Sequence, residues 1–189
     1  MYSLNSYIAF LLISLLVLPI VSCGHVWFFP KIDEEMPGWM QIKSVKMFIS
    51  NITKKDLYLL IELYESLPKR KLKYLFKIFF NSDGNLNTGD PRNKGADLLL
   101  YFLREISRND VGKSTYAPLY PYNDVSKRFE IKNFIRINAL ISNSTTFLFI
   151  LPLKMFNIKK LNETFVKIYV KISYEVAYPF YIGKNTNEV

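Results

Sequence analysis

The chain has 189 residues, a formal net charge of +9 and a hydrophobic content of 50%, with 16% aromatic residues. This length predicts one domain with a sizeable core, and the apolar content excludes an intrinsically disordered protein. Cys23 is the single cysteine of the chain, which excludes an intramolecular disulfide and a cysteine-based zinc site.

The first predicted element is an apolar leader. Residues 1–22 contain no Asp, Glu, Lys or Arg, and residues 7–21 are apolar apart from Ser14. This run is shorter than the ~20 residues of a transmembrane helix and contains Pro19 near its end, which favours a cleaved signal peptide. An uncleaved anchor stays open as the alternative, because the segment lacks the Lys or Arg that orients a signal peptide. Residues 1–23 therefore predict an extracytoplasmic protein, secreted or anchored at the cell surface.

The end of the leader contains a candidate lipidation site. Ile20-Val21-Ser22-Cys23 resembles the lipobox of bacterial-type lipoproteins, in which the cysteine is acylated and becomes the mature N-terminus. On this resemblance Cys23 would tether the protein to a membrane through a lipid. The alternative is a small apolar residue near the end of an ordinary signal peptide.

All of the net charge lies after the uncharged leader. It favours attraction to anionic head groups, anionic glycans or other polyanions. Nucleic acid is not an expected partner, because the Lys and Arg residues are scattered through predicted strands and an exported protein seldom meets nucleic acid.

From residue 24 onward the sequence has the period of two that is typical of strands. In residues 71–80, apolar side chains occupy the even positions and lysines occupy positions 71, 73 and 77. Residues 164–176 alternate similarly, and one helical turn is expected near 153–158. Eight or nine strands without a βαβ rhythm predict an all-β fold, an antiparallel, jelly-roll-like β-sandwich over residues 24–182, followed by a polar tail at 183–189. The other predicted strands are 25–29, 41–50, 56–65, 97–106, 128–132, 136–141 and 145–151.

Residues 79–97 form a polar segment between two apolar runs. Asn and Asp alternate along it, and Gly84 and Gly89 permit tight turns. Ca²⁺ needs several oxygen ligands on such a turning segment, although Arg92 stands where an EF-hand would have its bidentate Glu. The alternative is a plain turn in which Asn and Asp bond their own backbone. The candidate ligands are Asn81, Asp83, Asn85, Asn87, Asp90 and Asp97.

The loop of residues 79–97 and its flanking strands also resemble part of a known protein family. "IFFNSDGNLNTGDPRNKGADLLLYF" resembles a recurring part of extracytoplasmic β-sandwiches related to family 9 carbohydrate-binding modules and DOMON-like domains. There, an Asp-x-Asp-x-Asn…Thr-Gly loop leads into Gly-Ala-Asp and the next strand. "GWMQIKSVKMFISNITKKDLYLLIEL" is similar to their opening, so the resemblance covers residues 38–103. It implies a β-sandwich, a cation-stabilised loop and a carbohydrate ligand, with Asn81 in place of the first acid.

Carbohydrate-binding modules of this kind stack aromatic rings on sugars. In "STYAPLYPYND", Tyr116, Tyr120 and Tyr122 are the candidate ligand-binding residues. We expect an exposed loop there, because Pro118 and Pro121 suppress regular strand pairing. The alternative is that these rings cover one end of the sandwich.

Catalytic and haem chemistry are not expected. His25 is the only histidine, so neither the Met/His haem ligation of some DOMON-like relatives nor a histidine zinc site is predicted. A Ser-His-Asp triad would also depend on His25, and Glu62 with Asp97 is only a formal carboxylate pair. Asn51, Asn143 and Asn162 begin glycosylation sequons in predicted turns.

These patterns together predict a non-catalytic extracytoplasmic binding module. Its expected ligand is a carbohydrate or a cell-envelope component, on the strength of the family resemblance. The alternative is a structural cell-surface protein that assembles through sheet edges or through its basic face.

Overall fold

The computed structural model describes the backbone of residues 24–28, 37–49, 55–156, 165–172 and 175–182, and the side chains of residues 37–49 and 55–156. The predicted leader with Cys23, the sequon residues Asn51 and Asn162, and the polar tail lie outside the described residues. No helix in the described part is long and apolar enough to cross a membrane.

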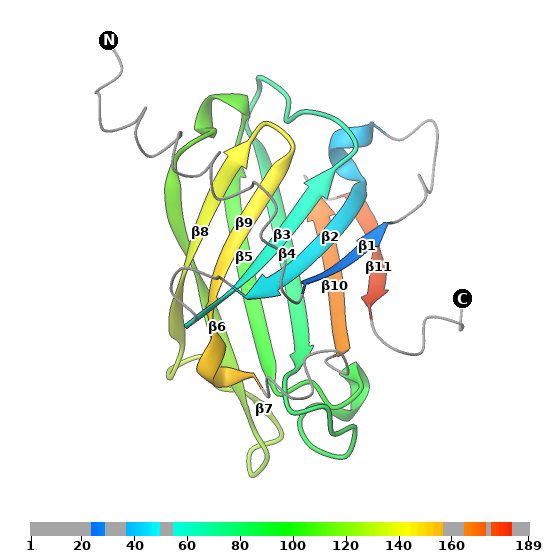
Figure 1. The fold of residues 1–189 in the computed structure, drawn as a ribbon, viewed down its shortest axis with the longest axis vertical. Helices are drawn as coiled ribbons and strands as arrows, with labels where there is room; N and C mark the ends of the chain where they lie inside the picture. The colour runs from blue at the N-terminus through cyan, green and yellow to red at the C-terminus, as the bar shows by residue number, and fades with distance from the viewer. Residues whose placement is uncertain (1–23, 29–36, 50–54, 157–164, 173–174, 183–189) are drawn as a thin grey trace.

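The described strands form one antiparallel sheet that curls into two facing layers (Figure 1). The strand order is β1-β2-β3-β9-β8-β6-β5-β4-β10-β11, and β7 pairs with β6. The predicted fold class, an antiparallel β-sandwich, is confirmed. The strands are β1 (Gly24–Phe28), β2 (Ile42–Ile49), β3 (Asp56–Leu63), β4 (Leu72–Asn81), β5 (Leu98–Ile106), β6 (Ser114–Asn123), β7 (Arg128–Phe129), β8 (Ile135–Asn143), β9 (Thr146–Pro152), β10 (Phe165–Ile172) and β11 (Glu175–Ile182).

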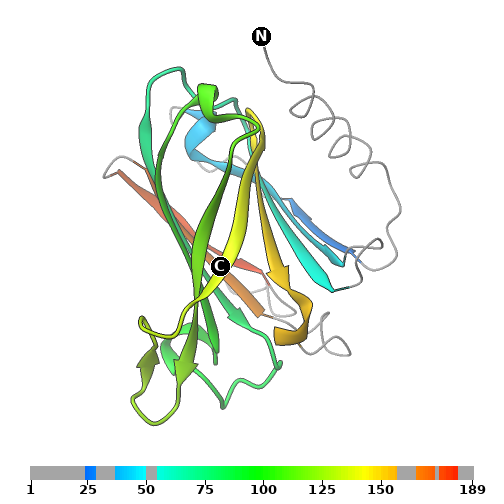
Figure 2. The same ribbon diagram turned by 90° about the vertical axis from the view of Figure 1, so that its left-hand side faces the viewer.

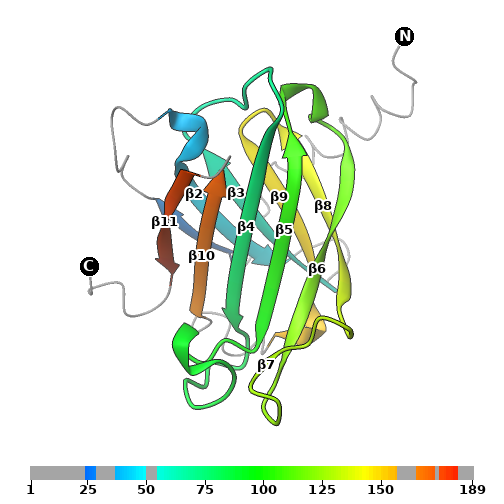
Figure 3. The ribbon, with the colours of Figure 1, turned by 180° about the vertical axis from the view of Figure 1, so that it is seen from behind.

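Each layer contains one half of the strand order. β1, β2, β3, β9 and β8 form the front layer in Figure 1, and β6, β5, β4, β10 and β11 form the layer that faces the viewer in Figure 3. The layers join where β6 pairs with β8, from Ser114↔Leu140 to Leu119↔Ile135. Figure 2 shows this junction from the side. The short 3-10 helices are η1 (Gly38–Met40), η2 (Pro91–Asn93), η3 (Arg108–Asp110) and η4 (Leu153–Met155).

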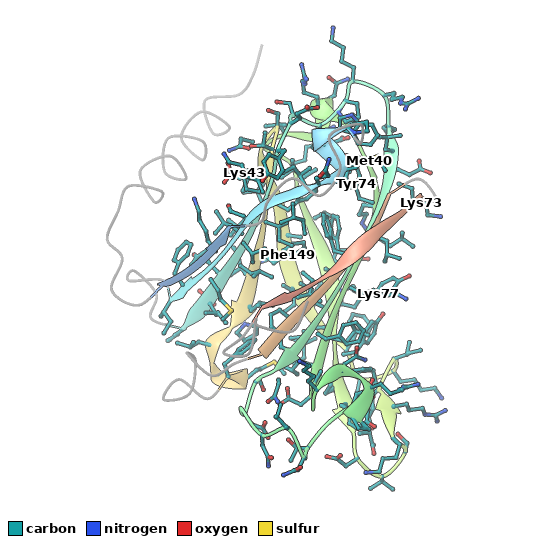
Figure 4. The ribbon with its side chains drawn as sticks, turned by 90° about the vertical axis from the view of Figure 1, so that its right-hand side faces the viewer. Met40, Lys43, Lys73, Tyr74, Lys77 and Phe149 are labelled. Atoms are coloured by element: carbon teal, nitrogen blue, oxygen red, sulfur yellow. The ribbon has the colours of Figure 1, made fainter. Side chains whose placement is uncertain are left out.

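Aromatic side chains join the two layers in the core. Phe76 of β4 lies 4.9 Å from Phe147 of β9, centroid to centroid and edge-on, and Phe102 of β5 lies 5.4 Å from Phe149. All of these rings are buried. Figure 4 shows Tyr74 and Phe149 between the layers, while Lys73 and Lys77 point outward from β4. The alternation predicted for residues 71–80 is therefore confirmed.

β6 was not predicted, and the expectation of an exposed aromatic loop at residues 114–123 is wrong. Pro118 and Pro121 are compatible with a strand, because each lacks its backbone N–H at a position where β6 makes no hydrogen bond to a neighbouring strand. Tyr122 N donates to Asp97 O, so even-numbered residues of β6 direct their backbone toward β5 and odd-numbered ones toward β8 and β7. Pro118 would face β5, whose pairing with β6 covers only Leu98–Leu100, and Pro121 lies beyond the β8 ladder, which ends at Leu119. Proline is tolerated at such positions.

Two smaller differences concern strand limits. The strand expected at 128–132 contains only β7, and 164–176 divides into β10 and the start of β11. The helical turn expected near 153–158 is η4.

Candidate functional site

The β4–β5 loop is held in a fixed shape by its own backbone. Asp90 N donates to Ala96 O at 2.8 Å, and Gly95 N donates back to Asp90 O at 3.0 Å. Gly89 has φ +70°, and a Cβ placed there would lie 2.4 Å from Ala96 O. Only glycine fits at this close crossing of two backbone segments.

The first part of the loop folds around Asp83. Its carboxylate accepts hydrogen bonds from Asn85 N at 2.8 Å and from Thr88 Oγ1 at 2.9 Å. Asn85 Oδ1 in turn accepts from Asn87 N at 3.0 Å. These are the local side-chain-to-backbone bonds that the plain-turn alternative predicts. Thr88 is a partner that the sequence analysis did not assign.

Asp90 is held by its own neighbours. It is buried, caps η2 by accepting from Arg92 N at 3.1 Å, and accepts from Asn93 Nδ2 at 2.8 Å. Arg92 Nε lies 3.2 Å from the same carboxylate. Burial favours the neutral acid, but the bonds from Asn93 and Arg92 outweigh it and hold the pKa of Asp90 below its ordinary value. Its negative charge is therefore balanced within the loop.

Asp97 is a carboxyl of the loop whose pKa is raised, in contrast to that of Asp90. Ser82 N donates to Asp97 Oδ1 at 2.7 Å, and Ser82 Oγ donates to Oδ2 at 2.6 Å. Burial nevertheless raises the pKa of Asp97, and the nearby negative charge of Asp83 raises it further. The bonds from Ser82, which precedes Asp83 in the sequence, thus hold Asp97 beside the start of the loop.

Asn81 supplies a buried oxygen without a partner. Its side chain is 1% exposed, and its Nδ2 donates to Lys94 O at 3.0 Å. Its Oδ1 accepts no hydrogen bond. A buried acceptor without a partner is costly, and a cation or an ordered water would satisfy it. No three His, Cys, Asp or Glu side chains in the described ranges form a metal-binding group. A Ca²⁺ near Asp83 and Asp97 would therefore draw on amide, hydroxyl and backbone oxygens, which it accepts readily.

The three candidate tyrosines lie on one face of β6. Ala117 and Leu119 are buried, so Tyr116, Tyr120 and Tyr122 occupy the outward positions of the strand. We call Tyr116, Tyr120 and Tyr122 the outer tyrosine face. Tyr120 lies opposite Leu99 of β5 and 6.3 Å from the ring of Phe134, and Tyr122 lies 5.2 Å from the ring of Phe129.

Two arginines flank Tyr116. The guanidinium carbon of Arg136 lies 3.8 Å from the ring centroid, and that of Arg104 lies 5.2 Å from it. Arg104 is fixed in place, because its Nε donates to Thr115 Oγ1 at 3.3 Å. A hydrogen bond and the positive charge of Arg136, with the charge of Arg104, lower the pKa of Tyr116. The surface at Tyr116 thus combines an aromatic ring with two guanidinium cations.

A hollow of about 560 Å³ separates the β4–β5 loop from the β6–β7 turn. Tyr122 lines it together with Asp90 and Arg92 on one side and Asp124 and Lys127 on the other. Burial and the charges of Asp90 and Asp124 raise the pKa of Tyr122 above its ordinary value. The hollow therefore combines one ring with groups of both signs.

The remaining predicted residues lie apart from these two features. Asn143 is exposed at the last position of β8, next to the turn that leads to β9. Glu62 lies on β3 and accepts hydrogen bonds from Lys43 Nζ at 2.9 Å and from Ser44 Oγ at 2.8 Å. Asp97 directly precedes β5, which belongs to the opposite layer (Figure 1). The formal pair of Glu62 and Asp97 is thus divided between the layers.

Comparison of the chain with family models, with curated proteins and with solved structures finds no match. The resemblance of residues 38–103 to carbohydrate-binding and DOMON-like domains stays a prediction.

Proposed function

We propose that the protein is a non-catalytic binding module of the extracytoplasmic surface, and that the outer tyrosine face binds an acidic carbohydrate or another anionic component of the cell envelope. The observation that carries this proposal is Tyr116 flanked by the guanidinium groups of Arg104 and Arg136. Guanidinium groups pair with carboxylates through two hydrogen bonds and pack against aromatic rings. The net charge of +9 favours the same ligands.

Tyr120 and Tyr122 extend this surface along the strand. A tyrosine ring offers apolar area to a sugar face, and its hydroxyl offers a hydrogen bond. The line from Tyr116 to Tyr122 therefore suits an extended polymer, with the cations of Arg104 and Arg136 at one end and the hollow beside Tyr122 at the other.

Binding of the full chain to immobilised acidic and neutral oligosaccharides tests this proposal. We expect the acidic ones to be retained, and Arg136→Gln to weaken their binding about tenfold, the effect of losing one charge-assisted hydrogen bond. Arg70→Gln is the matched control, because Arg70 is exposed in the β3–β4 connection and its loss changes the net charge equally. Equal effects of the two substitutions would contradict a specific site at Tyr116.

We also propose that Ca²⁺ stabilises the β4–β5 loop through Asn81, Asp83 and Asp97. The supporting observations are the unpartnered Oδ1 of Asn81 and the two bonds by which Ser82, the neighbour of Asp83 in the sequence, holds Asp97 at the start of the loop. Thermal unfolding with EDTA and with excess Ca²⁺ tests this, because a ligand of the folded state raises the midpoint by mass action. We expect the rise to disappear in Asp83→Ala and Asp97→Ala. No rise in the parent protein would leave the loop as a turn held by its own hydrogen bonds.

Assembly of a structural surface protein is the second candidate function. β1 and β11 are the two ends of the strand order, and each pairs with one described neighbour. Sheet edges of this kind can pair with another chain. Concentration-dependent self-association without a ligand, measured by light scattering, favours this function over the binding module.

The predicted location and modifications belong to the same proposal. We propose that residues 1–23 export the protein as a cleaved leader or anchor, that Cys23 is acylated, and that Asn51, Asn143 and Asn162 are glycosylated where the host modifies exported proteins. Intact-mass and peptide mass spectrometry of the protein from its native host measures all of these. An uncleaved and unmodified chain in the cytoplasmic fraction would contradict the proposed location.

A further inference from the structure

Exposed apolar side chains gather at one end of the sandwich. Apart from Tyr116, the large hydrophobic side chains exposed in the described residues are Val125, 95% exposed, Ile131, 73%, Leu86, 59%, and Phe134, 49%. They belong to the β4–β5 loop, the β6–β7 turn and the β7–β8 connection, which lie together at the lower end in Figures 1 and 3. Single exposed apolar residues are ordinary, but their concentration at one end indicates an interaction site.

The most exposed of these side chains is displayed by an ordered turn. Asn123 Oδ1 accepts from Val125 N and from Ser126 N, each at 2.9 Å. Asn123 Nδ2 donates to Glu130, and Asn133 Nδ2 donates to the other oxygen of Glu130 at 2.8 Å. These bonds tie the β6–β7 turn to the β7–β8 connection, so Val125 and Ile131 project from one braced unit.

Cations surround the apolar tips. The side chain of Lys127 is 72% exposed and that of Arg92 is 81% exposed, and Arg128 and Lys132 are exposed as well. The acids of the same loops have local partners: Asp83 is bonded to Asn85 and Thr88, Asp90 to Arg92 and Asn93, and Glu130 to the two asparagines, and Asp124 lies 3.7 Å from Lys127. The end therefore combines projecting apolar side chains with exposed cations, of which Arg92 and Lys127 also pair with the neighbouring acids Asp90 and Asp124.

We propose that this end docks on the surface of an anionic lipid bilayer. We call it the loop end and define it by the apolar residues Leu86, Val125, Ile131 and Phe134 and the cations Arg92, Lys127, Arg128 and Lys132. The apolar side chains enter the boundary between head groups and acyl chains, and the cations meet anionic head groups. This contact is separate from the leader and adjoins the outer tyrosine face, because Arg92 and Lys127 line the hollow together with Tyr122.

The shape of the loop end favours a lipid surface over a protein partner. The exposed apolar side chains belong to separate segments, and Leu86 lines a hollow of about 560 Å³ together with polar groups such as Asn87 and Asp124. A protein interface needs a well-packed patch of about 800 Å² on each partner. A fluid bilayer adapts to separated tips without a complementary shape.

A polarity-sensitive fluorophore at position 125 of the full chain tests the proposal. In a Cys23→Ser background, which removes the single native cysteine, Val125→Cys gives one labelling site at the loop end and Lys69→Cys gives one at the opposite end. On vesicles of phosphatidylcholine with phosphatidylserine, we expect a blue shift at position 125, quenching by brominated lipid, and neither change at position 69. On phosphatidylcholine alone, we expect a smaller shift.

Two pairs of charge-reversal substitutions distinguish binding at the loop end from attraction by the net charge of the whole chain. Lys127→Glu with Lys132→Glu should raise the lipid concentration for the half-maximal shift about tenfold or more, because each cation near an anionic surface contributes to binding. Lys69→Glu with Lys71→Glu changes the net charge equally and should change the half-maximal lipid concentration by less than about twofold. Ile131→Ser, which keeps the net charge, should raise the half-maximal lipid concentration about fivefold. All of these residues are exposed, so the fold should persist.

Two results would overturn the proposal. A label at position 125 that keeps its aqueous emission on anionic vesicles shows that the loop end stays in water, even where the leader holds the chain on the membrane. Equal effects of the two charge-reversal pairs show that the net charge, and not this end, attracts the chain. Either result leaves protein docking as the remaining role of these apolar tips.

Discussion

The guanidinium carbon of Arg136 lies 3.8 Å from the ring centroid of Tyr116, although the two residues belong to different strands, β8 and β6. Their hydrogen bond and charge interaction stabilise the tyrosinate form, so the pKa of Tyr116 is lower than its ordinary value of 10.0.

Arg136→Gln should therefore raise the pKa of Tyr116. The substitution removes the largest cause of the shift, while Arg104 retains a smaller effect. NMR titration of tyrosine-labelled protein, with Tyr116→Phe to assign the signal, measures this pKa directly. Arg70→Gln is the control for a general change of charge and should leave the signal unchanged. A Tyr116 pKa that is the same in the parent and in Arg136→Gln would show that the stacked pair does not form in solution.

Asp97→Asn should stabilise the calcium-free protein increasingly as pH rises above about 3.8, the ordinary pKa of this carboxyl. Its pKa is raised in the folded state, so the folded state binds more protons than the unfolded one between the two pKa values. Stability is therefore lost as pH rises through that window. Asparagine stays neutral and can keep both bonds to Ser82, by accepting from its N–H and donating to its hydroxyl.

Urea unfolding in EDTA from pH 3 to pH 7 measures the difference between Asp97→Asn and the parent. Asp90→Asn is a control of opposite sign, because the pKa of Asp90 is lowered in the folded state. The stability that Asp90 contributes is present above its unfolded pKa and is lost as pH falls through its folded pKa. If the difference in stability between Asp97→Asn and the parent does not depend on pH, the pKa of Asp97 is not raised by burial in the folded state.

Phe147→Ala should lower the free energy of unfolding by about 3–5 kcal/mol, the usual cost of removing a buried ring. Phe147 packs edge-on against Phe76 at 4.9 Å and so connects the two layers. Phe134→Ala is the control at an exposed ring and should change stability by less than about 0.5 kcal/mol. Chemical denaturation gives both values. Similar costs for the two substitutions would argue against a core formed between the layers.

The sequence predicted the fold class and most strands, because burial on one face of a sheet imposes a period of two, as in β4. It missed β6 because the effect of a proline depends on which neighbour its nitrogen faces, and the strand order decides that. The partners of Tyr116 were missed for a related reason. Arg104 and Arg136 approach it only through the register of β5, β6 and β8. Side-chain periodicity contains no information about register between distant strands.

The β4–β5 loop shows the same limit at shorter range. Its turn-forming residues were recognised from composition, and their local bonds follow from residue type, as in the Asp83–Asn85 turn. The bonds from Ser82 to Asp97 and the buried oxygen of Asn81 depend on how the ends of β4 and β5 close the loop. The sequence could therefore name six candidate ligands without separating Asp90, which Arg92 and Asn93 already hold.

Gly89→Ala should destabilise the protein more than Gly112→Ala, although both glycines have a positive φ, 70° and 79° respectively. A left-handed conformation costs a residue with a Cβ about 1–2 kcal/mol, and Gly112 has open space around it, so its substitution measures this cost alone. At Gly89 the Cβ would also meet Ala96 O at 2.4 Å, and that backbone cannot move without breaking its bond from Asp90 N. Thermal unfolding of both variants should therefore give the lower midpoint for Gly89→Ala. Equal midpoints would mean that the two segments do not cross this closely and that the loop is not held in a fixed shape.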